Sequence, residues 1–179
     1  MKKVLLYAWE VSKIIIIAMA IVIPVRYFLF QPFFVKGQSM EPNFGNGDYL
    51  IVDEISYKFR EPARGEVIVF NYPENPSQRF IKRIIGLPGE TVEIKDNKIT
   101  IIKDENILIL DESKYIVSET SGDIKVVLKQ DEYFVLGDNR PFSFDSRRFG
   151  IVPEKEIIGR AVLRAWPFSE FDIFQTPDY

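Results

Sequence analysis

The chain has 179 residues, of which 46% are hydrophobic, and a formal net charge of −3. This length is enough for one domain of ordinary size plus a short additional segment. The negative net charge argues against nucleic acid as a partner. The chain contains neither cysteine nor histidine, which excludes disulfides and thiolate metal sites and removes the usual ligands of zinc and non-haem iron. We therefore expect neither a metal nor a cofactor.

The N-terminal segment is basic and apolar. Residues 1–36 carry a net charge of +4, so the remainder carries −7. Residues 14–25 form an uninterrupted apolar run, which as a helix would span only about 18 Å of a bilayer core of about 30 Å. Extension to Phe30 reaches the lower limit for a crossing, with Arg26 able to snorkel to the headgroups. We predict a transmembrane anchor helix in residues 1–30 and a separate domain over residues 31–179.

A cleaved signal peptide is the alternative interpretation of the same segment. Its basic start and short apolar core fit, but bulky residues follow the apolar run and no small-x-small cleavage site is present. Lys2, Lys3 and Lys13 precede the span, whereas Lys36 alone represents the basic residues just after it. This bias predicts a single-pass protein of the cell membrane with a cytoplasmic N-terminus and an exocytoplasmic domain.

Beyond residue 36, short runs rich in β-branched and aromatic residues alternate with turn residues, and helical periodicity is weak. This pattern predicts a mainly β domain, formed by an antiparallel sheet or barrel. Two hairpins are expected, one turning at Asp96-Asn97 and the other at Gln130-Asp131. The polar stretch 103–121 is expected to be a variable loop or a small subdomain. The predicted strands cover residues 49–52, 66–70, 79–85, 91–95, 98–103, 125–129, 133–136 and 157–166.

The first segment with potential chemistry contains Ser39, which lies two residues after Gly37 and three before Pro42. Glycine permits unusual backbone geometry and proline favours an extended or turn conformation before it, so this loop can present a hydroxyl to a cleft. Because the chain has no histidine, a serine nucleophile would need another base, and a neutral lysine is a known replacement. A surface turn without chemistry is the alternative.

Lys82 is the candidate base. In a strand, Phe80, Lys82 and Ile84 point to one face. An unperturbed lysine has a pKa of about 10.4, so to be half neutral at pH 7 it needs a fall of roughly three units, or about 4–5 kcal/mol. Burial can lower the pKa by that much. A solvated edge-strand lysine is the alternative; Arg83 points to the opposite face, and we expect one of the two faces to be wet.

A third polar segment follows the predicted strand 133–136. Its glycine and asparagine at positions 137 and 139 indicate a turn. Ser143, Asp145 and Arg147 alternate, so in an extended chain they share a face. A serine there could hydrogen-bond an amine without adding charge, and the aspartate and arginine could pair. A polar turn with a surface ion pair of little energetic value is the alternative.

These segments follow the apolar N-terminus in a characteristic order. The chain contains Gly37-x-Ser39-Met40-x-Pro42, then RFIKRIIGLPGE over residues 79–90, then GDNRPFSFDSR over residues 137–147. In this order the motifs resemble those of bacterial type I signal peptidases, in particular the short, single-anchor Gram-positive form. The resemblance covers the whole chain and implies a β-rich catalytic domain that acts as a serine endopeptidase with a Ser–Lys dyad.

The resemblance also implies a role for each matching residue. Ser39 would be the nucleophile, and Lys82 the general base that later protonates the leaving amine. Ser143 would hydrogen-bond and orient Lys82. Asp145 and Arg147 would brace the site.

The implied substrates are secretory preproteins with small residues at the first and third positions before the cut. The peptide would lie extended between the segment before the nucleophile and the lysine strand, and the pocket walls would be Phe33, Val35, Met40 and Phe80. Narrow apolar pockets explain a small-residue preference sterically. Gly37 stands where some family members have a serine that helps to hold the oxyanion, so that donor is absent here.

Two other functions fit parts of the sequence. A self-cleaving Ser–Lys repressor shares the chemistry, but it should be cytosolic with a DNA-binding head, which the apolar N-terminus argues against. A non-catalytic membrane-anchored β module that binds extended peptides would tolerate loss of Ser39. On the favoured hypothesis, the partners are preproteins and the lipid bilayer.

Overall fold

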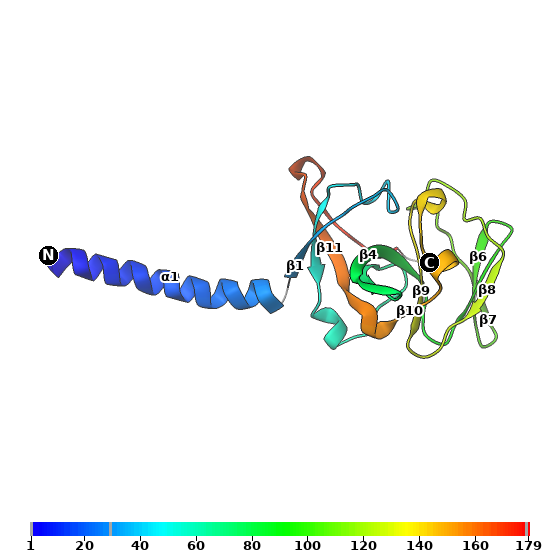
Figure 1. Cartoon of the computed structure of the whole chain (residues 1–179), viewed down its shortest axis with the longest axis horizontal. Helices are drawn as coiled ribbons and strands as arrows, with labels where there is room; N and C mark the ends of the chain where they lie inside the picture. Colours follow the sequence, from blue (N-terminus) through cyan, green and yellow to red (C-terminus); the bar gives the residue numbers. More distant parts are fainter. Residues whose placement is uncertain (1, 29, 178) are drawn as a thin grey trace.

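The N-terminal helix projects from one end of a β-rich body (Figure 1). The computed structural model describes residues 2–28, 30–177 and 179, and the side chains of these except 2–6, 8, 21, 23–28 and 30–31. Helix α1 covers Lys2–Phe28. Within the described part of the chain, no helix combines the length and the hydropathy needed to cross a membrane. The transmembrane helix predicted in residues 1–30 is not found among the described residues, and part of that prediction lies outside the described side chains.

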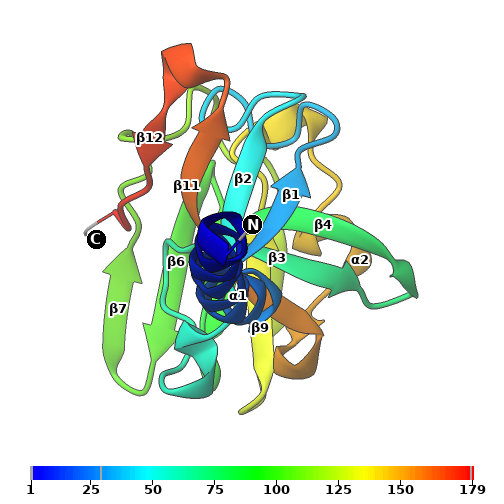
Figure 2. The same ribbon diagram turned by 90° about the vertical axis from the view of Figure 1, so that its left-hand side faces the viewer.

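The body is built around an antiparallel sheet of eight strands. Its strands are β1 (Phe30–Phe34), β2 (Tyr49–Asp53), β3 (Val67–Tyr72), β4 (Asn75–Gly86), β9 (Glu132–Leu136), β10 (Val152–Pro153), β11 (Ile157–Trp166) and β12 (Asp172–Ile173). The order is β1-β2-β11-β3-β4-β9-β10, with β12 paired to β11. β2, near the start of the chain, and β11, near its end, therefore lie side by side, with β1 on the other side of β2 (Figure 2). The predicted mainly β, antiparallel architecture is confirmed.

A second antiparallel sheet of four strands lies at the end of the body far from α1 (Figure 1). It contains β5 (Thr91–Lys95), β6 (Lys98–Lys103), β7 (Asn106–Ile109) and β8 (Ile124–Val127), in the order β7-β6-β5-β8. Asp96 and Asn97 join β5 to β6 with φ of 49° and 61°. Asparagine and aspartate tolerate this left-handed conformation, which a two-residue hairpin turn requires. The first predicted hairpin is confirmed.

The second predicted hairpin is wrong. β8 pairs with β5, whereas β9 pairs with β4 and β10 in the other sheet. The two strands have different surroundings: β8 is partly exposed along its length, and β9 is buried on both faces. Between them the chain passes from one sheet to the other. The stretch 103–121 includes β7 and a loop. Elsewhere in the body lie the short helices α2 (Ser146–Phe149), η1 (Ser56–Lys58), η2 (Arg140–Phe142), η3 (Glu154–Glu156) and η4 (Phe168–Glu170).

Strand β4 lies in the middle of the main sheet, between β3 and β9. Apolar clusters pack on both of its faces, with Ile81 in one cluster and Ile84 in another. Lys82 and Arg83 are consequently both buried, at 4% and 5% exposure. The expectation that one of these two faces would be wet is wrong, because β4 is a central strand rather than an edge.

Candidate active site

Ser39 lies in the loop between β1 and β2, which is fixed to the body from two sides. Met40 and Phe44 are each only 1% exposed and belong to the hydrophobic core. Gly37 has a φ of +90°, a conformation that favours glycine, and its N–H donates to Asn46 Oδ1 at 2.9 Å. The loop thus buries its apolar side chains and leaves Ser39 partly exposed.

The turn after β9 holds the same loop through its backbone. The Asn139 N–H donates to the Ser39 carbonyl at 3.0 Å, and Asn139 Nδ2 donates to the Gln38 carbonyl at 2.9 Å. Gly137 packs directly against these atoms, because a Cβ there would lie 2.4 Å from the Ser39 carbonyl oxygen and 2.2 Å from Ser143 Oγ. Residues 137 and 139 were expected only to form a turn; their contact with the serine loop joins segments about a hundred positions apart, which local turn chemistry cannot reveal.

Lys82 contacts Ser39 directly. Its Nζ donates to Ser39 Oγ at 2.7 Å and to the Ile81 carbonyl at 2.8 Å. Burial lowers the pKa of Lys82 to about 8, while the negative charges of Asp145 and Asp138 act in the opposite direction. At pH 7 such a group is neutral in roughly one molecule in ten. The structure therefore brings the two candidate catalytic side chains into hydrogen-bond contact.

Asp145 and Arg147 form a buried pair beside this contact. Arg147 Nη2 lies 2.9 Å from Asp145 Oδ2, and the aspartate is 0% exposed. Asp145 also accepts from the Gly137 N–H at 3.1 Å and caps the short helix α2 through the Arg147 N–H. Ser143 is buried, but its Oγ has no hydrogen-bond partner among the described residues, so the bond to Lys82 expected from the motif is not formed in this structure.

A groove of about 620 Å³ opens over the Ser39–Lys82 contact. Phe33 and Phe80, two of the four predicted wall residues, line it. Val35 and Met40 do not: they are 3% and 1% exposed and lie in the core, in the loop that follows β1. The aromatic wall is completed by residues that sequence reasoning missed, namely Phe34, Phe142 and Phe144.

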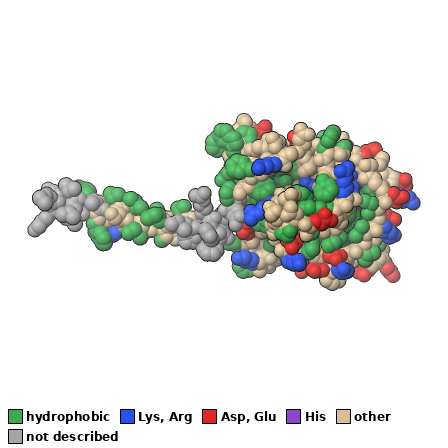
Figure 3. Space-filling model, in the orientation of Figure 1, with side chains coloured by type: hydrophobic (Ala, Val, Ile, Leu, Met, Phe, Trp, Pro, Cys, Tyr) green, Lys and Arg blue, Asp and Glu red, His purple; other side chains and the backbone are tan. Residues whose placement is uncertain are grey.

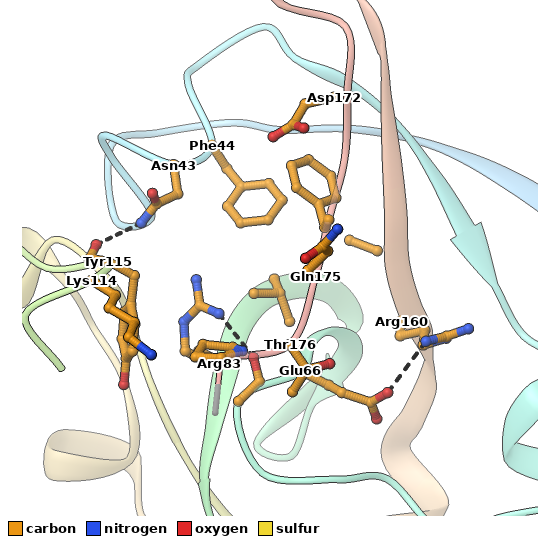
Figure 4. A pocket seen from close by; sticks show the side chains of 15 residues that line it. Asn43, Phe44, Glu66, Arg83, Lys114, Tyr115, Arg160, Asp172, Gln175 and Thr176 are labelled. Atoms are coloured by element: carbon orange, nitrogen blue, oxygen red, sulfur yellow. Dashed lines mark hydrogen bonds and ion pairs between the residues drawn. The ribbon is translucent and has the colours of Figure 1, made fainter. Parts of the chain in front are cut away.

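Arg83 serves the opposite face of β4. It forms two hydrogen bonds to Asp138, from Nε at 2.8 Å and from Nη2 at 2.6 Å, and it stacks over the Tyr115 ring at 4.2 Å. A second cavity of about 370 Å³ borders this guanidinium (Figure 4), and Asn43 bridges its rim by donating to the Tyr115 carbonyl. Among the charged side chains around this cavity, Glu66 forms an ion pair with Arg160 and so neutralises its charge.

A metal site was not expected from the sequence. Among the described residues, no three side chains of the metal-binding types gather closely enough to hold an ion. What the site offers instead is a hydroxyl, a buried amine and a groove that can accept an extended segment.

Comparisons with known proteins agree with the motif order. A family model described as "Signal peptidase, peptidase S26" matches residues 8–166. The chain is 39% identical to a probable signal peptidase I-2 of Synechocystis sp. over 88% of this chain and 73% of that protein. It is 40% identical to a signal peptidase I of Leptolyngbya laminosa, over 95% and 86% of the two chains.

A signal peptidase IB of Staphylococcus aureus is 35% identical and aligns over 99% of this chain and 98% of its own. A crystal structure of a signal peptidase I from Enterococcus faecalis V583 is 37% identical and covers 56% of this chain and 97% of that chain, with a TM-score of 0.48. Because the family model and the relatives span nearly all of the sequence, the chain belongs to the signal peptidase family, peptidase S26, and the predicted resemblance is confirmed.

Proposed function

We propose that this protein is a membrane-anchored endopeptidase that removes N-terminal signal peptides from exported preproteins by means of a Ser39–Lys82 dyad. The observation that carries the proposal is the 2.7 Å contact between Lys82 Nζ and Ser39 Oγ in a buried setting that lowers the pKa of the lysine. No histidine exists in the chain to compete for the role of base.

The chemistry follows from this contact. Neutral Lys82 accepts the hydroxyl proton of Ser39 while the oxygen attacks the scissile carbonyl carbon. The resulting ammonium then donates that proton to the departing amine, which leaves an acyl ester on Ser39. In the second half, Lys82 accepts a proton from water, the water oxygen attacks the ester, and the departing serine oxygen takes that proton from Lys82, which restores the hydroxyl and the neutral amine. Burial favours the neutral form of Lys82 and thereby lowers the pH above which the amine can act as a base.

The oxyanion needs a donor close to Ser39. Ser39 lines the groove and its backbone N–H has no acceptor among the described residues, so this N–H is the donor that we assign to the developing charge. Gly37 contributes no side-chain donor. Its positive φ instead shapes the loop so that the backbone can face the substrate carbonyl.

The supporting residues act on the lysine and on the loop. Asp145 opposes the effect of burial on the pKa of Lys82 and keeps it from falling further. Arg147 holds that aspartate in place. Ser143 has a buried hydroxyl without a partner in the described part of the chain, so we assign it to a hydrogen bond with the amine that forms once substrate closes the groove.

The groove accounts for a preference for small residues before the cut. Phe33 and Phe80 face it from two strands, and Phe142 and Phe144 face it from the 137–147 loop. Phe80 is held by stacking on Tyr72 with ring centroids 4.9 Å apart. Bulky aromatic rings on these walls leave less room for a branched or long side chain, which would have to displace them.

The anchoring part of the proposal concerns α1. Ile14, Ile15, Ile16 and Ile17 are between 51% and 67% exposed, and apolar side chains cover the described part of the helix away from the body (Figure 3). Such a surface is stable only when covered, and a bilayer covers it while Lys13 and its neighbours stay in the headgroups. When the enzyme is confined to the same membrane as its substrate, the effective concentration of each for the other rises.

The test is cleavage of a model preprotein by the wild-type protein, Ser39→Ala and Lys82→Met, all purified in detergent. We expect cleavage after a small residue by the wild type and a loss of at least about 10³-fold in each variant. Full activity in either variant would contradict the dyad. Binding of the preprotein by all three without cleavage would identify a non-catalytic peptide-binding module. Flotation with liposomes, with and without residues 1–28, tests anchoring separately, and equal flotation of both would contradict it.

A further inference from the structure

The segment between β7 and β8 carries a carboxylate that reaches the 137–147 loop. Glu112 is 6% exposed and accepts from both terminal nitrogens of Arg140, one of them at 2.6 Å. Tyr115 Oη at 2.7 Å and Thr120 Oγ1 at 3.2 Å also donate to this carboxylate. An ion pair so fully partnered is costly to break, since loss of either charge would leave the other buried without a counter-charge.

Arg140 is in turn tied to both ends of the loop. Its Nε donates to the Gly137 carbonyl at 2.9 Å, and its own carbonyl accepts from Arg147 Nη2 at 2.6 Å. The same guanidinium of Arg147 pairs with Asp145. The position of the Glu112 carboxylate therefore determines where Arg140 lies, and Arg140 determines the course of the loop.

The 137–147 loop is in direct contact with the backbone of the nucleophile, Ser39. Gly137 approaches the Ser39 carbonyl so closely that a single added carbon would lie 2.4 Å from it, and the Asn139 N–H bonds to the same oxygen at 3.0 Å. Close-packed atoms move together, so a shift of the loop moves Ser39 or opens its contact with Lys82. Misplacement of reacting groups by about 1 Å can cost about 100-fold in rate.

We propose that Glu112 is a positioning residue for the Ser39–Lys82 pair and acts through Arg140. This inference rests on the proposed function. It assigns to the segment 110–121, which the sequence marks only as a variable loop or subdomain, a part in holding the active site. The connection between β7 and β8 thus contributes to catalysis without lining the groove.

A buried pair elsewhere supplies a matched control. Glu90 is 4% exposed, pairs with Arg64 at 2.7 Å and accepts from the Leu87 N–H at 2.8 Å. It resembles Glu112 in burial and in having an arginine partner, but no described contact joins it to the 137–147 loop. Glu90→Gln should therefore lower stability as Glu112→Gln does, and leave the catalytic geometry unchanged.

The experiment compares the full-length wild type, Glu112→Gln and Glu90→Gln in detergent, with kcat and KM for a model preprotein measured from pH 6 to pH 10.5. We expect Glu112→Gln to lower kcat by about tenfold to a hundredfold while the protein remains folded. Its pH–rate midpoint should also move to higher pH, because burial is the main cause of the low pKa of Lys82 and a displaced loop admits water. Glu90→Gln should keep both kcat and the midpoint of the wild type. A purely structural role for Glu112 predicts the same unchanged midpoint in both variants.

The double variant Glu112→Leu, Arg140→Met separates positioning from stability. Apolar replacements of a buried ion pair often restore stability. Methionine at position 140, however, cannot make the hydrogen bond that Arg140 Nε donates to the Gly137 carbonyl. We expect a folded protein whose kcat stays low. Wild-type kcat in this variant, or wild-type kcat and midpoint in Glu112→Gln, would overturn the inference while the wild type still cleaves and Ser39→Ala does not. An inactive wild type would instead overturn the proposed function.

Discussion

Replacement of Lys82 by methionine should stabilise the folded protein at neutral pH and destabilise it at high pH. Methionine has a similar length and no charge. In the wild type, burial lowers the pKa of Lys82 from 10.5 to about 8. Below pH 8 both the folded and the unfolded chain carry the proton, so the folded state bears the full penalty of a buried ammonium. Between pH 8 and 10.5 only the unfolded state keeps the proton, and wild-type stability therefore rises through this window.

The size of the effect follows from the shift in pKa. About 2.5 units correspond to about 3 kcal/mol at roughly 1.4 kcal/mol per unit, and solvent screening is small because Lys82 is only 4% exposed. Methionine also loses the bonds to Ser39 and to the Ile81 carbonyl, at a cost of about 1 kcal/mol each. Lys82→Met should then be about 1 kcal/mol more stable than the wild type at pH 7, and about 2 kcal/mol less stable near pH 10.5.

Chemical denaturation in mild detergent at a series of pH values measures this difference. Groups that titrate in both proteins cancel in the comparison. The two curves of unfolding free energy against pH should cross between pH 8 and 10.5. Parallel curves would refute the argument, since they would mean that Lys82 titrates alike in the folded and unfolded chains and is no better a base than a surface lysine.

Four further outcomes are expected. The kcat of the wild type should rise with pH through the pKa of Lys82 near 8 and should not respond to EDTA; loss of activity on chelation would contradict a metal-free mechanism. Gly137→Ala should lower kcat by about 100-fold or more with the fold retained by circular dichroism, because its Cβ would meet the Ser39 carbonyl oxygen at 2.4 Å, and wild-type kcat would show that the loop yields freely. Phe33→Ala should improve cleavage after larger residues, relative to alanine, by about tenfold. Val35→Ala should keep the wild-type preference and lose about 1–3 kcal/mol of stability, because Val35 lies in the core; a change in preference would place it in the groove instead.

The class of fold and the pairing of Ser39 with Lys82 agree with the structure better than the predicted walls of the groove do. Ser39 and Lys82 could be chosen because each lies in a recognisable motif and because no histidine competes with the lysine. Val35 and Phe33 could not be told apart, because the sequence does not show that β1 ends at Phe34 and that the loop after it turns Val35 into the core. Phe144 was not predicted as a wall residue because it is far in the sequence from most of the other residues that line the groove, and only the fold brings its loop next to them.

Long-range partners account for the remaining errors. The burial of Arg83 depends on Asp138, which lies 55 positions away and supplies its counter-charge. The hairpin expected at Gln130-Asp131 has the right strands and turn residues, but the apolar residues of β9 are buried between β4 and β10. Local pattern identifies strands, whereas the choice of neighbour depends on which apolar faces meet.

The neighbouring positions of Lys82 and Arg83 make the alignment of β4 with β3 a condition for catalysis. Ile68 lies opposite Lys82 and Val67 opposite Arg83 in that ladder. Sliding β4 by a single residue would exchange its two faces and bring a guanidinium, which does not give up its proton in proteins, against the nucleophile. Lys82 would then lie on the far face, so whatever fixes the pairing of these two strands also keeps the proposed base in contact with Ser39.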